Sequence, residues 1–354
     1  MSKYPVPGIV LNLLGYWLRR SNVAALNQVR RLTDSILGRA NLALVRRSAL
    51  HPEATGPSYI AGPLPPGAEE RLRANHPRLL DLERRYRGHP ASPHPIWQQD
   101  AVSNKVTMQY FRGDNLYLWQ VRARLRPEQY AVTMLYTEHH DPLDLLATLS
   151  EDGLFGAHTF NLDGRAVSRD LLDSITELTF LQEEMGITSA SQLNILDIGA
   201  GYGRLAHRAT TAMPKFHYFC ADAVPLSTFL SEYYLHFRGC SRATVIPLDN
   251  IRERLAGRRI DLAVNIHSFS ECPIAAISWW LDILAANDVG HLMIVPNKGT
   301  ELSSFEPTGM RRDYRPIIES RGFELVVQRP KYAHSRMVQE YGVNPTTYFL
   351  FRRH

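Results

Sequence analysis

A glycine-rich segment in the second half of the chain constrains the fold more than any other feature of the sequence. It spans residues 194–206 and reads Asn-Ile-Leu-Asp-Ile-Gly-Ala-Gly-Tyr-Gly-Arg-Leu-Ala. The apolar residues of its first part suit a central parallel strand, and Gly199, Gly201 and Gly203 allow backbone angles and a close ligand approach that a Cβ would block. A helix that starts after the loop would point its N-terminal amides at a ligand. The segment therefore predicts a nucleotide-binding turn.

Two acidic residues indicate which nucleotide this turn binds. Asp197 lies two positions before the first glycine, which gives D-x-G-x-G-x-G rather than the G-x-G-x-x-G of nicotinamide and flavin enzymes. A carboxylate here would repel a pyrophosphate and attract a cationic aminoacyl group, which favours S-adenosylmethionine as the cofactor. Asp222 follows the strand expected at 216–221, near the roughly 20-residue offset at which a carboxylate binds ribose hydroxyls. The alternatives are a solvated strand end for Asp197 and a helix cap for Asp222.

Four further residues are candidates for the same cofactor site. Ala200 and Arg204 belong to the glycine segment itself. Asp249 follows a strand expected at 244–248, and Asn265 lies near the end of a strand expected at 260–266. Both positions are at carboxyl ends of strands, where open α/β sheets bind their ligands.

The order of elements after the turn predicts the fold class. Strands alternate with helices, and the last two strands have no long helix between them. The expected strands are 194–198, 216–221, 244–248, 260–266, 290–295, 323–328 and 346–352, and the expected helices include 226–237, 275–286 and 315–321. This pattern indicates an α/β, Rossmann-like, doubly wound sheet with an antiparallel last strand, the order of a class I methyltransferase. An oxidoreductase would instead continue into a second nucleotide-binding half.

The length of 354 residues, 44% of them hydrophobic, exceeds what one such domain needs. We expect a mainly helical N-terminal region with Pro-rich linkers at 1–100, a helical cap or acceptor region at 101–185, and the methyltransferase domain at 186–354. The three cysteines have no disulfide or metal spacing, which indicates a reducing, cytoplasmic compartment. The apolar stretch 6–18 is interrupted by Asn12 and has its arginines after it, so neither a signal peptide nor a membrane span is expected. A helix that packs on the body or joins a homo-oligomer is favoured there, with peripheral membrane contact as the minor alternative.

The formal net charge of +5 is mild for this length. Much of the excess comes from arginine pairs before residue 90: Arg19-Arg20, Arg30-Arg31, Arg46-Arg47 and Arg84-Arg85. Such pairs usually form a solvated helix face. No nucleic-acid partner is expected, because a dense basic stripe with stacking aromatics is absent, although a phosphorylated acceptor would be attracted.

Candidates for binding the substrate lie mainly between residues 110 and 181. His139 and His140 stand among acids, although a helix-capping loop explains the pair equally simply. Asp170 and Asp173 fall on one stripe of a helix expected at 169–183, which would cover the cofactor. Ser168 is the expected N-cap of this helix. Asn297, two residues after the strand at 290–295, is the last candidate.

Three segments together resemble a known family. They are residues 163–175, with the sequence Asp-Gly-Arg-Ala-Val-Ser-Arg-Asp-Leu-Leu-Asp-Ser-Ile, residues 195–204 of the glycine turn, and residues 265–271, with the sequence Asn-Ile-His-Ser-Phe-Ser-Glu. Together they resemble the sugar O-methyltransferases of bacterial natural-product and polysaccharide gene clusters. The resemblance covers roughly Tyr110 to the C-terminus, and none is found for the first hundred residues. It implies methyl transfer from S-adenosylmethionine to a hydroxyl of a sugar or glycoside.

His267 is the expected general base. It follows a buried strand at the rim where ligands lie, and histidine titrates in the range that suits removal of a hydroxyl proton. Glu271 lies four residues further on and would hold the imidazole in the correct tautomer if a helical turn begins there. The alternative is that His267 bonds a backbone carbonyl while Glu271 caps the helix that opens at Pro273.

A metal-assisted variant and two other functions remain open at this point. A divalent cation such as Mg²⁺ would need carboxylates, for which Asp170, Asp173, Asp222 and Glu271 are available, but no compact motif exists and no metal is expected. The rival functions are a methyltransferase with a non-sugar or protein acceptor, and a non-catalytic S-adenosylmethionine-binding partner protein.

Overall fold

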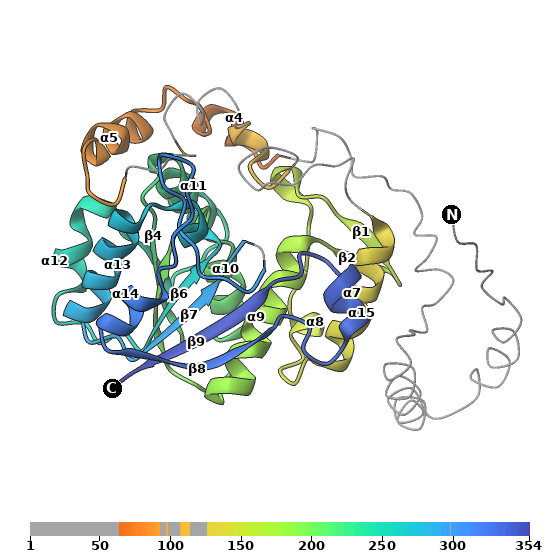
Figure 1. Ribbon diagram of the computed structural model, residues 1–354. Helices are drawn as coiled ribbons and strands as arrows, with labels where there is room; N and C mark the ends of the chain where they lie inside the picture. The colour runs from red at the N-terminus through yellow and green to blue at the C-terminus, as the bar shows by residue number, and fades with distance from the viewer. Residues whose placement is uncertain (1–63, 93–96, 98–106, 114–125, 298) are drawn as a thin grey trace, which may run out of the picture.

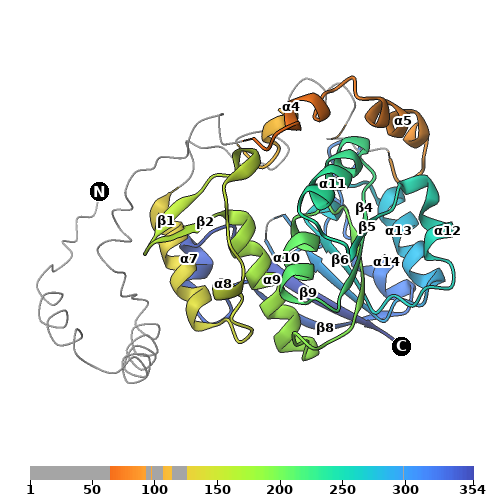
Figure 2. The same cartoon turned by 180° about the vertical axis from the view of Figure 1, so that it is seen from behind.

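The computed structural model describes residues 64–92, 97, 107–113, 126–297 and 299–354. Figures 1 and 2 show two parts, a large sheet with helices on both faces and a smaller, mainly helical lobe. The apolar stretch 6–18, and with it the expected N-terminal oligomer contact, lies outside the described residues. No helix in the described ranges is long and apolar enough to cross a membrane.

The large part contains a mixed sheet of seven strands in the order β5-β4-β3-β6-β7-β9-β8. The strands are β3 (Asn194–Ile198), β4 (His217–Ala221), β5 (Ala243–Val245), β6 (Leu262–Ile266), β7 (His291–Val295), β8 (Phe323–Pro330) and β9 (Thr347–Arg353). Strands β5, β4, β3, β6 and β7 are parallel, whereas β9 runs antiparallel between β7 and β8. This order, with its antiparallel last strand, confirms the expected doubly wound class I methyltransferase fold.

Helices cover both faces of the sheet, as the two opposite views show. They are α9 (Arg169–Met185), α10 (Arg204–Ala212), α11 (Pro225–Phe237), α12 (Ile251–Leu255), α13 (Ile274–Ala286) and α14 (Arg315–Ser320), with the short turns η5 (Leu248–Asn250) and η6 (Ser268–Glu271). The expected elements of this half agree within one or two residues at most ends. The strand expected at 244–248 is wrong at its C-terminal end, because Leu248 opens the turn η5 instead.

The smaller lobe stands on the other side of α9 (Figures 1 and 2). Its elements are η2 (Met108–Tyr110), α7 (Pro127–His139), α8 (Leu145–Thr148), η4 (Leu154–Gly156), β1 (Phe160–Leu162) and β2 (Arg165–Val167), and α15 (Arg336–Tyr341) packs against α7. Strands β1 and β2 form a hairpin whose two-residue turn, Asp163-Gly164, has positive φ at both positions, as a type I′ turn requires. These two short strands are not among the strands that the sequence predicts.

Helix α9 begins where the sequence indicates. The Ser168 hydroxyl accepts the N–H of Leu171, so Ser168 is the N-cap, and Gly186 in the left-handed conformation ends the helix. Every residue of α9 from Asp170 to Leu181 is buried, because the helix lies between the sheet and the smaller lobe. Asp170, Asp173 and Glu177 are therefore interior groups.

Two helices of the expected N-terminal region are described, α4 (Ala68–Arg71) and α5 (Pro77–Tyr86). Helix α5 packs on α11, and the two views agree that it lies beyond the end of the sheet near α11 and α12. The boundaries expected at residues 100 and 185 remain predictions.

Candidate functional site

The glycine loop between β3 and α10 has the geometry that its sequence predicts. Gly199, Gly201 and Gly203 all have positive φ, between 59° and 86°. The N–H groups of Gly199 and Ala200 both donate to the carbonyl of Ala221, at 2.8 and 3.2 Å, which ties the loop to the end of β4. A Cβ at Gly199 would lie 2.3 Å from the Cβ of Ser268. The loop therefore packs directly against the segment that follows β6, and only glycine fits there.

Asp222 closes the loop from the neighbouring strand. One carboxylate oxygen accepts the N–H of Gly201 at 2.9 Å, and the other accepts the N–H of Val224 at 2.8 Å. The second bond closes a local turn before α11, whose N-cap is Val224 without a side-chain capping bond, so the alternative of Asp222 as the helix cap is wrong. Each carboxylate oxygen can accept about two hydrogen bonds, so the group keeps acceptor capacity for a ligand.

Asp197 and Asp222 are both buried, at 4% and 8% exposure. Burial is the main cause that raises the pKa of Asp197 to about 7, and the carboxylates of Glu177 and Asp222 add to it while Arg204 opposes it. Burial also raises the pKa of Asp222 to about 7, against the two backbone N–H groups that lower it. Interior carboxylates with such pKa values favour a cationic or hydrogen-bonding ligand, which would compensate their charge.

Asn265 connects the glycine loop to η6, the turn that follows β6. Its side-chain amide donates to the carbonyl of Ile198 at 2.8 Å, and its side-chain oxygen accepts the N–H of Phe269 at 2.9 Å. The residue is almost completely buried. Asn265 therefore fixes the end of β3 relative to η6, and its side chain supports the glycine loop.

His267 occupies a strained position between β6 and η6. Its φ is 69°, a conformation that costs energy for any residue except glycine and that is common at functional sites. The backbone is held there by the N–H of His267, which donates to the carbonyl of Val295 at 2.7 Å. The imidazole itself has no hydrogen-bond partner among the described residues. The alternative of a ring bonded to a backbone carbonyl is therefore not what the structure shows.

Burial lowers the pKa of His267 to about 3, and the nearby cations Arg169, Arg204 and Lys331 lower it further while Asp173 opposes them. The imidazole is consequently neutral at physiological pH. A neutral ring can accept the proton of a hydroxyl group, which an imidazolium cannot.

Glu271 does not hold the imidazole, so the expected tautomer-setting contact is wrong. One carboxylate oxygen accepts the indole N–H of Trp97 at 2.6 Å, and the other accepts the side-chain amide of Asn297 at 3.0 Å. No hydrogen bond joins Glu271 to His267, both of which the structure describes. The reason is that η6 is a short 3₁₀ turn preceded by a residue at positive φ, so the helical i, i+4 relation does not apply.

The acids of α9 and the arginine of the glycine turn form buried ion pairs. Arg204 binds Glu177 with two bonds of 2.8 and 2.9 Å and also donates to the Ser174 hydroxyl. Asp173 accepts bonds from Lys331, from Arg169 at 3.2 Å and from Asn344 at 3.2 Å. The charge of Asp173 acts on the pKa of His267, but its carboxylate is already bound by these three partners.

Asp170 belongs to a buried cluster that the sequence analysis missed. Its carboxylate accepts the Nε–H of Arg112 at 3.2 Å and the hydroxyl of Tyr202 in the glycine loop. Arg112, 1% exposed, also binds Glu151 at 2.7 Å, and Arg208 binds the same oxygen of Glu151 at 3.0 Å. The cluster thus anchors the glycine loop to the smaller lobe. No local signal in the sequence around Arg112 indicates these distant partners.

Asp249, the remaining cofactor candidate, lies in η5 after β5. Its two carboxylate oxygens accept the Nε–H and Nη2–H groups of Arg85, each at 2.8 Å. Arg85 belongs to α5, so this contact joins the N-terminal region to the carboxyl edge of the sheet.

The two adjacent histidines lie at the C-terminal end of α7. The Nδ1 of His139 bonds the carbonyl of Leu135 at 2.7 Å, and the Nδ1 of His140 bonds the carbonyl of Tyr136 at 2.8 Å. Both rings thus cap the end of the helix, which agrees with the capping alternative. The ring of His140 also stacks on His334, with ring centroids 4.9 Å apart.

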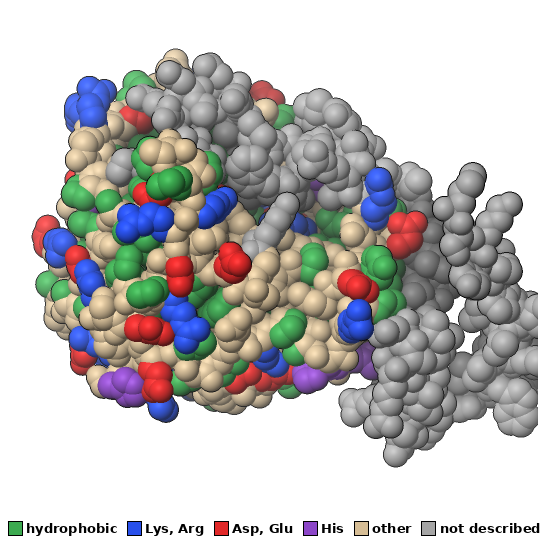
Figure 3. Space-filling view, in the orientation of Figure 1, with side chains coloured by type: hydrophobic (Ala, Val, Ile, Leu, Met, Phe, Trp, Pro, Cys, Tyr) green, Lys and Arg blue, Asp and Glu red, His purple; other side chains and the backbone are tan. Residues whose placement is uncertain are grey.

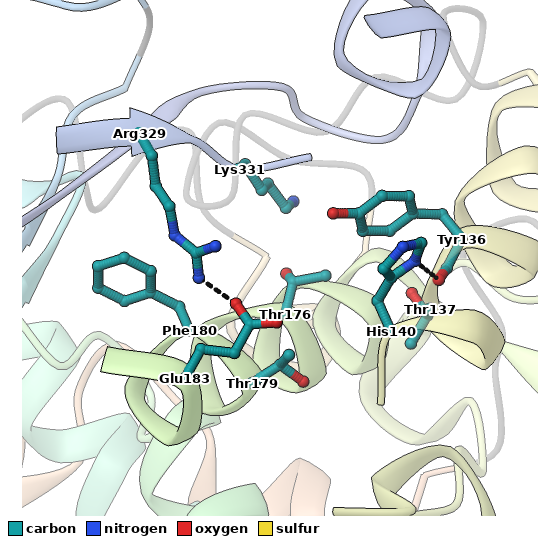
Figure 4. Close-up of a pocket in the computed structure, with 9 residues that line it drawn as sticks. All are labelled: Tyr136, Thr137, His140, Thr176, Thr179, Phe180, Glu183, Arg329 and Lys331. Atoms are coloured by element: carbon teal, nitrogen blue, oxygen red, sulfur yellow. Dashed lines mark hydrogen bonds and ion pairs between the residues drawn. The ribbon is translucent and has the colours of Figure 1, made fainter. Parts of the chain in front are cut away.

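His140 lines a small cavity between α7, α9 and the end of β8 (Figure 4). The cavity has an empty volume of about 320 Å³, part of it open to solvent. Its lining residues are Tyr136, Thr137, His140, Thr176, Thr179, Phe180, Glu183, Arg329 and Lys331. The close-up shows the Arg329 guanidinium joined to Glu183 across one side. None of the cofactor candidates lines this cavity, so it is separate from the glycine loop.

The described residues form no metal cluster. No group of three or more His, Cys, Asp or Glu side chains gathers in the described part as a cation site would require. The candidate ligands Asp170, Asp173, Asp222 and Glu271 all have the partners given above. On the face drawn in Figure 3, basic and acidic side chains are interspersed over the described surface.

Comparison with known proteins gives a likeness of fold. No protein-family profile matches the chain, and no curated protein matches it. Among solved structures, the chain resembles magnesium protoporphyrin IX methyltransferase ChlM from Synechocystis PCC 6803 with bound SAM, at 14% identity, over 52% of this chain and 79% of that one, with a TM-score of 0.36.

Two other solved structures show the same partial likeness. They are Mitomycin 7-O-methyltransferase MmcR, at 17% identity over 52% of this chain and 57% of that one, and TrmN from Thermus thermophilus, at 14% identity over 52% and 49%, both with a TM-score of 0.36. The chain thus spans only about half the length of these two proteins. At this distance the assignment of the fold rests on the strand order of the sheet itself.

Proposed function

We propose that this chain is an S-adenosylmethionine-dependent O-methyltransferase that transfers a methyl group to a hydroxyl of a sugar. One observation carries the proposal. At the carboxyl edge of the class I sheet lie a glycine loop, two buried carboxylates and the His267 imidazole, which has no hydrogen-bond partner among the described residues. Each of these groups would contribute to the transfer of a methyl group from sulfur to oxygen.

The buried carboxylates would hold the two polar ends of the cofactor. A cationic amino group beside Asp197 would stabilise its ionised form, which burial disfavours in the free protein. Asp222 would accept ribose hydroxyls through the lone pairs that Gly201 and Val224 leave free. Asn265 would act indirectly, because it holds the loop and η6 together.

The reaction is a single in-line displacement. The acceptor oxygen forms a bond to the methyl carbon, the carbon–sulfur bond breaks, and its electron pair stays on sulfur, which gives S-adenosylhomocysteine. As the new bond forms, the hydroxyl proton becomes strongly acidic, so even a base with a pKa of about 3 can accept it. His267 would take this proton and would first align the hydroxyl by accepting its hydrogen bond.

The sugar acceptor is supported by the resemblance of three segments and by the polar character of the region around His267. Asn297 follows β7 at the same edge, and its side chain is held in place by Glu271. We propose that Asn297 and Glu271 border the acceptor, with Glu271 as a positioning residue rather than a partner of the base. Asp170 and Asp173 are each already bound in ion pairs, which favours a structural role for both residues. A divalent cation is not part of the proposal.

The direct test is a transfer assay with methyl-labelled S-adenosylmethionine and a panel of free sugars, glycosides and sugar nucleotides. We expect label in at least one sugar class, with S-adenosylhomocysteine formed in equal amount. Tight cofactor binding without transfer to any acceptor would favour the non-catalytic binding protein. Transfer only to aromatic hydroxyl compounds or to protein would contradict the sugar assignment.

The same assay tests the base. We expect His267→Ala to lower kcat by about 10²- to 10⁴-fold, the usual contribution of general-base catalysis, with S-adenosylhomocysteine binding retained. His291→Ala is the matched control, because His291 begins β7 at the opposite end of the sheet. Near-normal turnover of His267→Ala across a pH series would exclude the role of this imidazole.

A further inference from the structure

A segment of the N-terminal region crosses the carboxyl edge of the sheet. It comprises residues 76–92 and Trp97, and is called the rim strap here. Its contacts follow the order of the chain: Arg78 binds Glu232 of α11 with two bonds of 2.9 and 2.5 Å, Arg85 binds Asp249 of η5, and Trp97 binds Glu271 of η6. These three elements follow β4, β5 and β6 in turn. The rim strap therefore borders the crevice in which the proposed cofactor would lie.

Of these three contacts, the one at η5 has the most hydrogen bonds. The Tyr86 hydroxyl accepts the N–H of Leu248 at 2.8 Å and shares a hydrogen bond of 3.0 Å with the Thr228 hydroxyl. Beside it, Arg85 binds both oxygens of Asp249 and also the side-chain oxygen of Asn250 at 2.8 Å. Helix α5 thus supplies the partners that fix the backbone and the acidic side chain of η5.

The strand order shows what η5 would face. Strands β3, β4 and β5 are consecutive neighbours, with the glycine loop after β3 and Asp222 after β4. If the amino-acid end of the cofactor lies at Asp197 and the ribose at Asp222, the base must extend toward the loop after β5. Asp249 lies there, and the two bonds from Arg85 leave it further lone pairs for an exocyclic amine.

We propose that Arg85 and Tyr86 of the rim strap form the outer wall of the cofactor site, and that Arg85 is a positioning residue that orients Asp249 toward the adenine end of S-adenosylmethionine. The inference rests on the proposed function. It extends that function by making residues outside the methyltransferase domain part of the cofactor site. A planar guanidinium suits this task, since it fixes both oxygens of a carboxylate at once.

The test compares two neighbouring arginines of α5 by calorimetric titration with S-adenosylhomocysteine. Arg85→Gln removes the fork that holds Asp249, and we expect the Kd to rise about 5- to 10-fold. Arg84→Gln removes the same charge from a side chain that is 76% exposed and pairs with Asp81, and it should leave the Kd unchanged. Arg85→Lys, which keeps the charge but loses the fork, should give an intermediate Kd. In the transfer assay Arg85→Gln should raise the KM for the cofactor with little change in kcat.

Hydrogen exchange on the wild-type chain provides an independent measurement. Saturation with S-adenosylhomocysteine should slow exchange of the amides of residues 77–86 and of η5. An unchanged Kd for Arg85→Gln, or unchanged exchange in α5 when the ligand is bound, would overturn the inference while the proposed function stands. Failure of the wild-type chain to bind S-adenosylhomocysteine would overturn the proposed function and the inference with it.

Discussion

At the scale of single residues, burial shifts the pKa values of the acidic and basic groups of the site in opposite directions. It raises the pKa of Asp197 and of Asp222 to about 7, and it lowers the pKa of His267 to about 3. In each case burial favours the neutral form. The free site therefore holds neutral or nearly neutral groups that a cationic cofactor and a hydroxyl acceptor can engage.

The raised pKa of Asp197 predicts a stability gain on its removal. A folded-state pKa of about 7, above the unfolded value near 3.9, means that the folded protein holds the proton more tightly, so stability is lost as the pH rises through 7. Asp197→Asn should stabilise the free protein at pH 8 by about 1 to 3 kcal/mol. The gain should shrink at pH 5.5, and the affinity for S-adenosylhomocysteine should fall.

Urea unfolding at pH 5.5 and pH 8 measures the two free energies of unfolding. Asp222→Ala serves as a comparison, because it also removes the acceptor of the Gly201 and Val224 N–H groups and should gain less. A loss of stability of Asp197→Asn at both pH values would contradict the role of burial at this residue.

The residues of the glycine turn could be predicted from the sequence because a tight loop depends on local backbone geometry. Gly199, Gly201 and Gly203 have the positive φ that their spacing indicated. The partner of Glu271 could not be predicted, because it comes from Trp97, far away in the chain. The i, i+4 spacing of a helix predicted His267 as the partner of Glu271 instead. That prediction is wrong because His267 has a positive φ and only a short 3₁₀ turn follows it.

At the scale of elements, α9 connects the sheet to the smaller lobe through buried charges. Glu177 binds Arg204, Asp173 binds Lys331, and Asp170 binds Arg112. The N-cap residue Ser168 predicted the start of the helix correctly. The sequence did not predict that the acidic stripe is buried, since the arginines and the lysine that neutralise it come from other elements.

The Arg112 cluster predicts a large loss of stability when its cation is removed. Arg112→Met leaves Glu151 with Arg208 as its remaining ion-pair partner and Asp170 without an ion pair among the described residues. We expect the free energy of unfolding to fall by about 3 to 5 kcal/mol, as for other broken buried ion pairs. Urea unfolding at pH 7 measures this change.

Arg259→Met is the matched control for this substitution. Arg259 is 87% exposed and pairs with Asp261 at 2.8 Å, so its loss should change the free energy of unfolding by less than about 1 kcal/mol. Equal effects of the two substitutions would show that the Arg112 cluster does not hold the smaller lobe on the glycine loop.

At the scale of the whole molecule, the strand order joins three separate regions into one site. The glycine loop, η5 and η6 follow β3, β5 and β6 at one edge of the sheet, and the rim strap contacts η5 and η6 there. The alternation of strands and helices predicted the sheet, because the hydrophobic pattern of each element is local. The position of residues 76–92 and Trp97 could not be predicted, because arginine pairs look alike on a solvated face and at an interface.

The central claim is that the glycine loop binds S-adenosylmethionine, and calorimetric titration of the full chain with S-adenosylhomocysteine tests it most directly. We predict one binding site per chain, loss of binding in Gly199→Val, whose side chain would collide with Ser268, and no heat with NAD. Absence of S-adenosylhomocysteine binding in the folded wild-type chain, or saturable binding of NAD in its place, would contradict the account.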